Sequence, residues 1–267
     1  MTETTDLLVE TREQVLWLTL NRPQRRNALT AEVVQGLQAA LQTASRQRDV
    51  RAVVLTGAGD DAFCSGADLR PGTFTFDYSE PYQWLADLMR QARQMGVPII
   101  GRINGLCLAG GMGLLALCDL VVAHADAQFG LPESKVGLFP FQVLAELQNL
   151  LPRRILTEMC IAGRRLSSAE ALQYGLINQI AGVAGASDVP DGPTLDQAIA
   201  TLLEQVCAQS PAALRRGVYT LKHIDSLPFE AAMAFTESQI GLMTQTADFA
   251  EGVTSFIEKR APRWTGR

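Results

Sequence analysis

A glycine-rich stretch, Ile103–Asp119, constrains this chain more than any other feature. It follows a strand-like apolar run, Val97–Ile103, and contains Gly105, Gly110, Gly111 and Gly113. A glycine in a helix interior costs ~1 kcal/mol relative to alanine, so the stretch does not suit an ordinary helix. Glycine lets the backbone come close to a ligand, and the first turn of a helix offers unpaired N–H groups. The stretch therefore predicts either a site for oxygen carrying negative charge or close packing of a helix on a sheet.

The first part of the chain has the pattern of a β-α-β unit. Val15–Leu20 is an apolar run rich in strand formers, and Ala52–Thr56 is a second one. Between them, Thr30 is placed to cap a helix, with Glu32 favourable in its first turn. Apolar residues then fall on one helical face, namely Val33, Val34, Leu37 and Leu41. This order predicts parallel strands joined by a right-handed crossover.

Similar signals continue along the chain. The pattern predicts a helix around Tyr82–Met95, a buried strand at Leu120–Ala123 and a helical region from Phe141 through Met159. Ser167 and Glu170 have the spacing of a capping box. Before the first of these helices lies a loop with three aromatic residues, Phe74, Phe76 and Tyr78. These aromatic side chains either wall an apolar pocket or pack as a local flap.

The end of the chain differs from its beginning. Ala181–Pro193 is rich in Gly, Ala, Asp and Pro, which predicts a linker or surface loop. Everything after Leu195 has a helical pattern. We therefore predict an α/β core over residues 1–194 and a C-terminal helical subdomain over residues 195–267.

Composition excludes several classes of function. With 267 residues, 47% of them apolar and a net charge of −5, the chain is typical of a globular protein and has no basic tract for nucleic acid. It has no apolar signal-peptide core at its start and no run near the ~18 residues of a membrane span. Its five cysteines form no C-x-x-C pair and lie mostly in apolar surroundings. They predict a reducing compartment, with the cytoplasm as the expected location.

Motifs for metals and common cofactors are missing. His124 and His223 are the only histidines, and no cluster of His, Cys, Asp and Glu has metal-ligand spacing. The chain has neither a G-x-S-x-G motif nor a phosphate-binding G-x-x-x-x-G-K-[ST] motif. Gly57-Ala58-Gly59 lacks the third glycine of a dinucleotide fingerprint. We therefore expect no metal and no separate cofactor.

Short motifs along nearly the whole chain match one known family in its order. They are Asn21-Arg22-Pro23 with Asn27-Ala28-Leu29, Phe63-Cys64-Ser65-Gly66-Ala67-Asp68-Leu69, Asn104-Gly105 through Gly110-Gly111 to Cys118-Asp119, Phe129-Gly130-Leu131-Pro132-Glu133 with Val136-Gly137, and Glu251-Gly252 with Phe256-Ile257-Glu258-Lys259-Arg260-Ala261-Pro262. In these motifs the chain resembles the crotonase superfamily, whose best-known members are enoyl-CoA hydratases and isomerases. The resemblance implies a crotonase-like α/β fold of the ClpP/crotonase type, a spiral of β-β-α turns with a C-terminal α-helical subdomain.

The resemblance also implies an oxyanion hole and a CoA site. The backbone N–H groups of Ala67 and Gly110 correspond to the two that hold the thioester carbonyl and stabilise the enolate formed from it. Arg25 and Arg26 fall where the family contacts CoA, and two cations suit its phosphates. By their residue types alone, both arginines are solvated surface residues. The other predicted substrate-binding residues are Ser65, Gly66, Asp68, Leu69, Gly111, Gly113, Phe141, Phe256 and Lys259. Lys259 lies where the family often brings a basic side chain to the CoA of a neighbouring subunit.

The acid–base group departs from the family's pattern. Hydratases of the family usually place two glutamates around the reacting carbons. Glu133 corresponds to one, whereas the position of the other is Gly113, and the glycine-rich turn after Pro140 reads Phe141-Gln142-Val143. One carboxylate suffices to move a proton between two carbons, while addition of water is normally assisted by two. The alternative is that Glu133 is a surface residue or an ion-pair partner.

These observations favour an enoyl-CoA hydratase/isomerase-family enzyme acting on an acyl-CoA thioester, with a single glutamate that favours isomerisation of a double bond. The first alternative is an enoyl-CoA hydratase, and the second is a non-catalytic acyl-CoA-binding member of the family. A serine peptidase on the related Clp-protease fold is excluded, because Leu108–Gly113 contains no Ser, Thr or Cys. The resemblance further implies a homotrimer or a homohexamer, with CoA as part of the substrate.

Overall fold

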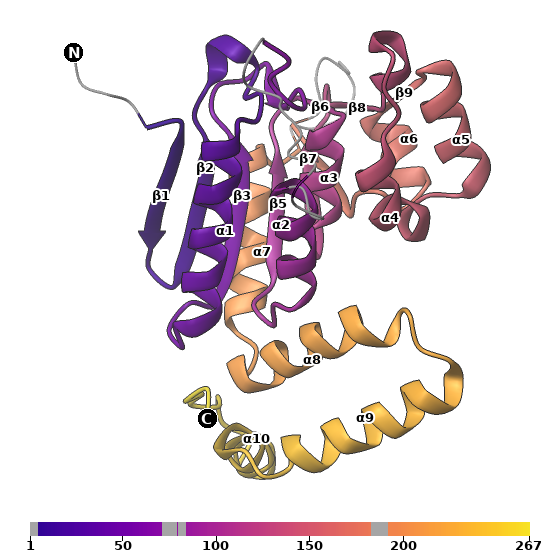
Figure 1. The fold of residues 1–267 in the computed structure, drawn as a ribbon. Coiled ribbons are helices and arrows are strands. Elements are labelled where there is room, and N and C mark those ends of the chain that lie inside the picture. Colours follow the sequence, from indigo (N-terminus) through magenta and orange to yellow (C-terminus); the bar gives the residue numbers. More distant parts are fainter. Residues whose placement is uncertain (1–4, 71–78, 80–83, 183–191) are drawn as a thin grey trace.

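The computed structural model describes residues 5–70, 79, 84–182 and 192–267. Its main sheet has six strands in the order β1-β2-β3-β5-β7-β10, and only the β1–β2 pairing is antiparallel (Figure 1). The strands are β1 (Leu7–Arg12), β2 (Val15–Leu20), β3 (Ala52–Gly57), β5 (Ile99–Ile103), β7 (Leu120–His124) and β10 (Gln179–Ala181). The aromatic residues Phe74, Phe76 and Tyr78 lie outside the described residues.

The predicted β-α-β unit is confirmed. Strands β2 and β3 are parallel and are joined through helix α1 (Ala31–Arg46). Thr30 caps this helix, since its side-chain oxygen accepts a hydrogen bond from the N–H of Val33 at 3.3 Å. The predicted apolar face is buried. Local capping and periodicity thus set this part of the fold.

Helices cover both faces of the main sheet. Successive side chains of a strand point to opposite faces, so each buried strand contributes to two apolar clusters. On β3, Val53 and Leu55 face the side covered by α1, α2 (Trp84–Arg93) and α3 (Gly110–Ala116). Ala52 and Val54 face the other side, where α7 (Leu195–Cys207) packs. Figure 1 shows α1 and α2 in front of the sheet and α7 behind it.

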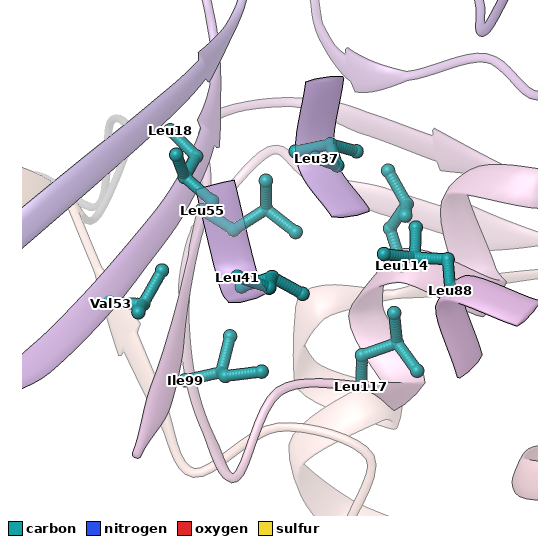
Figure 2. A pocket seen from close by; sticks show the side chains of 9 residues that line it. All are labelled: Leu18, Leu37, Leu41, Val53, Leu55, Leu88, Ile99, Leu114 and Leu117. Carbon is teal, nitrogen blue, oxygen red and sulfur yellow. The ribbon is translucent and has the colours of Figure 1, made fainter. Parts of the chain in front are cut away.

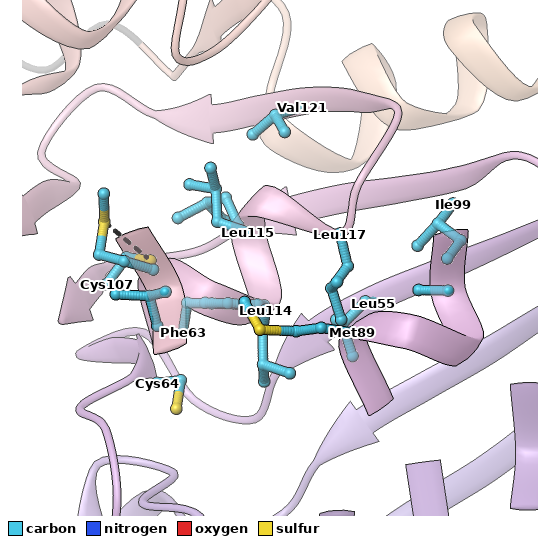
Figure 3. Packing of buried hydrophobic residues seen from close by; sticks show 14 of the residues in the cluster. Leu55, Phe63, Cys64, Met89, Ile99, Cys107, Leu114, Leu115, Leu117 and Val121 are labelled. Carbon is cyan, nitrogen blue, oxygen red and sulfur yellow. Dashed lines mark hydrogen bonds between the residues drawn. The ribbon is translucent and has the colours of Figure 1, made fainter. Parts of the chain in front are cut away.

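The larger core cluster extends from the main sheet to the glycine-rich segment. Figure 3 shows part of it, with Phe63, Cys64, Cys107 and Leu114 packed together. The thiol of Cys107 lies 3.8 Å from the sulfur of Met112. All five cysteines are free, and Cys64, Cys107 and Cys160 are buried.

A small void lies inside this cluster. Its volume is about 10 Å³. Nine buried aliphatic residues line it, namely Leu18, Leu37, Leu41, Val53, Leu55, Leu88, Ile99, Leu114 and Leu117 (Figure 2). A space of this size and polarity stays dry and holds no acyl group, so it is a packing defect of the core.

A second, smaller sheet has the strand order β4-β6-β8-β9. Its strands are β4 (Ala62–Cys64), β6 (Leu106–Leu108), β8 (Gln128–Gly130) and β9 (Arg165–Ser167). The β4–β6 and β6–β8 pairings are parallel, and β8–β9 is antiparallel. Three strands of this sheet therefore point the same way, toward one edge.

The remaining elements surround the two sheets. They are the short 3₁₀ helices η1 (Pro23–Arg25) and η2 (Glu133–Val136), and α4 (Phe141–Leu150), α5 (Arg153–Ala162), α6 (Ser168–Gln173), α8 (Pro211–Ile224), α9 (Phe229–Met243) and α10 (Ala247–Ile257). The helical region expected from Phe141 through Met159 consists of two helices, because Leu151 is extended and Pro152 precedes α5. The capping box of Ser167 and Glu170 is confirmed at the start of α6.

The C-terminal region is helical, as predicted. Helix α7 packs on the main sheet, whereas α8, α9 and α10 form a layer at one end of it (Figure 1). Helix α8 is tied to the core by the ion pair of Lys222 with Asp119, whose closest atoms are 3.1 Å apart. The division at residues 194 and 195 stays a prediction. Across the described residues, no helix combines the length and apolar character that a membrane span requires.

Candidate active site

The candidate site lies at the carboxyl edge of the small sheet. Because β4, β6 and β8 are parallel, the segments that follow them start from the same edge. Gly66–Asp68 follows β4, the start of α3 follows β6, and Glu133 comes shortly after β8. The topology thus brings the three segments that the motifs single out to the same edge of the small sheet.

The segment after β4 is held on both sides of Ala67. The N–H of Leu29 donates to the carbonyl of Gly66 at 2.8 Å, and the N–H of Asp68 donates to the carbonyl of Leu29 at 2.8 Å. Ala67 therefore forms a parallel bridge with Leu29. The N–H of Ala67 itself has no hydrogen-bond acceptor among the described residues. It remains available to a ligand.

A strained residue starts α3. Ala109 has φ 50° and ψ −118°, a conformation that alanine rarely adopts and that costs of order 1–3 kcal/mol. Its N–H donates to the carbonyl of Gly130 at 3.0 Å, which ties the turn to the end of β8. The N–H of Gly110, the next residue, also has no acceptor within the part of the chain that the structure describes. This conformation and the hydrogen bond to Gly130 together set the direction of the backbone where Gly110 begins the helix.

Close packing explains two of the glycines, while a third faces Ala67. A Cβ on Gly105 would lie 2.5 Å from the carbonyl oxygen of Asp61, and one on Gly111 would collide with the carbonyl oxygen of Cys64. These two glycines allow close packing. A Cβ on Gly110 would instead lie 3.7 Å from the nitrogen of Ala67. Gly110 therefore faces the turn that carries the other unpaired N–H.

The carboxyl group of Glu133 is partly withdrawn from solvent. It is half-buried at the start of η2, and burial raises its pKa above the ordinary value. Its Oε2 atom is buried without a hydrogen-bond partner among the described residues. The charge of Glu133 in turn contributes, after burial, to a raised pKa of the Cys160 thiol on α5. A carboxyl group in this state is suited to exchanging a proton with a bound ligand.

Position 113 offers no second carboxylate and no open space. Gly113 is buried in α3, and a Cβ there would lie 2.8 Å from Cγ1 of Val143 and 3.3 Å from Cε of Met89. Val143 lies on α4 and Met89 on α2, and both are buried. The sequence singled out Val143 only as part of the altered turn Phe141-Gln142-Val143, and it gave no sign of Met89. Sequence reasoning missed the contact of both residues with position 113, because this contact joins separate helices.

The predicted CoA-contacting residues lie around the segment after β4. Arg25 ends η1, Arg26 has a φ of 49°, and both are exposed. The N–H of Ser65 donates to the carbonyl of Arg26 at 3.0 Å, which brings Arg26 beside this segment. Leu69 is 53% exposed. The carboxylate of Asp68, in contrast, is buried and bound by two arginines, so it is not available to a ligand.

The other predicted site residues lie on separate helices. Phe141 is 75% exposed at the start of α4, the helix whose Val143 faces α3. Phe256 lies on α10 and Lys259 directly after it, both exposed. Figure 1 shows α10 at the opposite end of the molecule from the small sheet, with α8 between them. Within one chain, the fold does not bring Phe256 and Lys259 to the segments that carry Ala67, Gly110 and Glu133.

Comparison with known proteins agrees with these motifs. The family model described as enoyl-CoA hydratase/isomerase matches residues 10–267. Enoyl-CoA hydratase EchA19 of Mycobacterium tuberculosis is 33% identical over 270 residues, which cover 98% of this chain and 97% of that protein. The 2,3-dehydroadipyl-CoA hydratase of Escherichia coli is 30% identical over 268 residues, which cover 98% of this chain and 99% of that protein.

Solved structures agree with the fold. An enoyl-CoA hydratase from Mycobacterium smegmatis matches with a TM-score of 0.86 at 30% identity, covering 98% of this chain and 99% of that chain. One from Bacillus anthracis matches with a TM-score of 0.88 at 26% identity, covering 98% of this chain and 100% of that chain. The predicted crotonase-like α/β fold with a helical C-terminal region is confirmed. The chain belongs to the enoyl-CoA hydratase/isomerase family of the crotonase superfamily.

Proposed function

We propose that this protein isomerises the double bond of an enoyl-CoA thioester, with Glu133 as its acid–base group. The carboxylate of Glu133 takes a proton from C2 of a 3-enoyl thioester, and the electron pair moves onto the thioester oxygen. The N–H groups of Ala67 and Gly110 stabilise this oxygen. Glu133 then returns the same proton to C4, which leaves the double bond between C2 and C3. The reaction moves one proton and needs no separate cofactor.

The state of Glu133 carries this proposal. Burial raises the pKa of this carboxyl group, and its Oε2 atom has no hydrogen-bond partner within the part of the chain that the structure describes, so it holds a proton more readily than an ordinary glutamate and can pass it to a bound ligand. Position 113 holds glycine, so no second carboxylate stands there to hold a water molecule. Loss of one oxyanion-hole donor in other enzymes costs roughly 3–4 kcal/mol of transition-state stabilisation, which shows why two open N–H groups matter.

Hydration of a 2-enoyl-CoA is the second candidate. It is favoured by the relatives, since both the Mycobacterium tuberculosis and the Escherichia coli proteins are hydratases by name. In that reaction Glu133 would act on the water and on the C2 proton in turn. Glycine at position 113, in place of the family's second glutamate, makes this the weaker candidate.

We further propose that CoA lies along the segment after β4, with Arg25 and Arg26 near its phosphates, and that the protein works as a trimer or hexamer. Exposed apolar side chains on α9 and α10 support an assembly through these helices, namely Phe229, Ile240, Phe256 and Ile257. In such an assembly, Phe256 and Lys259 of one subunit would reach the CoA of another.

A panel of thioesters tests the proposed reaction. The purified protein is incubated with 3-enoyl-CoA and 2-enoyl-CoA esters of several chain lengths, and the products are separated by chromatography. We expect 3-enoyl esters to yield 2-enoyl esters faster than 2-enoyl esters yield 3-hydroxyacyl esters. Faster hydration would favour the second candidate, and CoA-ester binding without any turnover would show a non-catalytic acyl-CoA-binding protein.

A further inference from the structure

The space beside Gly113 is filled by two apolar side chains. A Cβ at this position would lie 2.8 Å from Cγ1 of Val143, closer than real Cβ atoms approach other carbons, and 3.3 Å from Cε of Met89. The side chains of Val143 and Met89 are 3% and 5% exposed. The methyl end of Met89 is adaptable, but Val143 is β-branched and restricted in χ1. Val143 is therefore less able than Met89 to move aside for a side chain at position 113.

This space adjoins the two open N–H groups. Gly113 lies about one helical turn after Gly110, so the two positions share a face of α3. The Cα–Cβ bond of a helical residue leans toward the helix start, so a side chain at position 113 would lean toward Gly110. Gly110 in turn faces Ala67. A polar group at position 113 would thus stand beside the place proposed for the thioester oxygen.

We infer that Val143, supported by Met89, is a specificity-determining residue that keeps a second acid and its water out of the site. This inference rests on the proposed function and extends it. A buried apolar wall offers no hydrogen bond to a water molecule, so water is not held in line for attack on C3. The proton on Glu133 then returns to carbon. The choice between isomerisation and hydration therefore depends on the packing of α4 against α3 as well as on the loss of one glutamate.

A stability experiment tests the contact without any assay of activity. Gly113→Ala, Val143→Ala and the double variant are unfolded in urea and compared with the parent. We expect Gly113→Ala to lower the midpoint in the parent, because its new Cβ meets Val143. In the Val143→Ala background the same change should leave the midpoint unchanged or raise it. Equal effects of Gly113→Ala in both backgrounds would overturn the inference.

An activity experiment tests the consequence. Gly113→Glu, Val143→Ala and the double variant are assayed for hydration of a 2-enoyl-CoA, with folding checked by circular dichroism. We expect the double variant to hydrate at least ~10-fold faster than the parent, short of the ~10²–10⁴-fold that a fully optimised acid–base group contributes, and Gly113→Glu alone to gain less than the double variant. If the double variant does not fold, Gly113→Asp with Val143→Ala takes its place.

Two outcomes of the activity experiment would also overturn the inference. Either Gly113→Glu alone gains as much hydration as the double variant, or a folded double variant that binds CoA esters gains none. Failure of the proposed function is distinguishable from failure of this inference, because it is seen in the parent protein as an absence of 3-enoyl-CoA isomerisation. The stability result is independent of that reaction.

Discussion

The guanidinium of Arg22 lies 3.0 Å from the carboxylate of Asp68, and both side chains are only 7% exposed. Arg22 also donates to the carbonyl of Ala28 at 2.6 Å, and its backbone N–H donates to the side chain of Asn27 at 3.0 Å. Asp68 holds Arg70 as well, at 2.6 Å. This network joins the segment 22–29 to the segment after β4. It thereby positions Ala67, which lies directly before Asp68.

Asp68→Asn tests this network, because it keeps the shape and removes the charge. Among the described residues, it leaves the buried Arg22 guanidinium with the half-exposed Asp6, at 2.9 Å, as its one acidic partner. We expect a loss of about 3 kcal/mol in the free energy of unfolding, the low end for breaking a buried ion pair. Asp87→Asn is the matched control, because Asp87 pairs with Arg90 on the surface, where a pair contributes ~0–1 kcal/mol. Equal losses for both variants would contradict this account.

The contribution of Asp68 to stability should depend on pH. Hydrogen bonds from Arg70, and then from Arg22, hold the pKa of Asp68 well below its usual range. A lowered pKa in the folded state adds stability above the unfolded pKa, and this stability is lost as the pH falls through the folded pKa. The difference between the parent and Asp68→Asn should therefore shrink in strong acid. Urea unfolding at several pH values measures it.

Local signals predicted much of the fold. Strand β2 matches the expected Val15–Leu20, Thr30 caps α1, and Ser167 and Glu170 form the expected capping box. Each of these features depends on residues that are close in sequence, so propensity and spacing are enough to find them. The small sheet was not predicted, because β4, β6, β8 and β9 are too short for a period of alternating side chains to be recognised.

The site was predicted by resemblance rather than by periodicity. Motifs indicated Ala67, Gly110 and Glu133, and the structure has their segments at one edge of the small sheet. The pairing of Arg22 with Asp68 joins residues 46 positions apart, and the contact of Val143 with Gly113 joins two helices. Only the folded chain brings such residues together. The roles of the predicted site residues stay predictions.

The pH dependence of isomerisation tests the state of Glu133. Burial raises the pKa of this carboxyl group, and only its ionised form takes a proton from C2. The kcat/KM for a 3-enoyl-CoA should therefore fall on the acid side, with a midpoint above the ~4.3 of an ordinary glutamate. A midpoint at or below that value would assign the acid limb to a different group.

Lys259→Ala tests the proposed contact between subunits. Lys259 is exposed just after α10, where a solvated cation is the alternative. We expect binding of a CoA ester to weaken a few-fold, as for an ion pair of ~0–1 kcal/mol, and salt to erase the difference. A pantetheine thioester, which lacks the nucleotide, should bind as before, and Lys259→Arg should bind both ligands normally. Equal weakening for both ligands would indicate a role in folding or assembly instead.

Glu133→Gln tests the central claim most directly, since it keeps the shape of the side chain and removes its ability to accept a proton. Because burial disfavours the charged form, the variant should be at least as stable as the parent at neutral pH. Glu204→Gln, on the exposed side of α7, is the control and should keep full activity. The measurement is kcat for isomerisation of a 3-enoyl-CoA. We predict that Glu133→Gln lowers kcat at least ~100-fold with little change in KM. A kcat close to that of the parent would contradict the single-carboxylate mechanism.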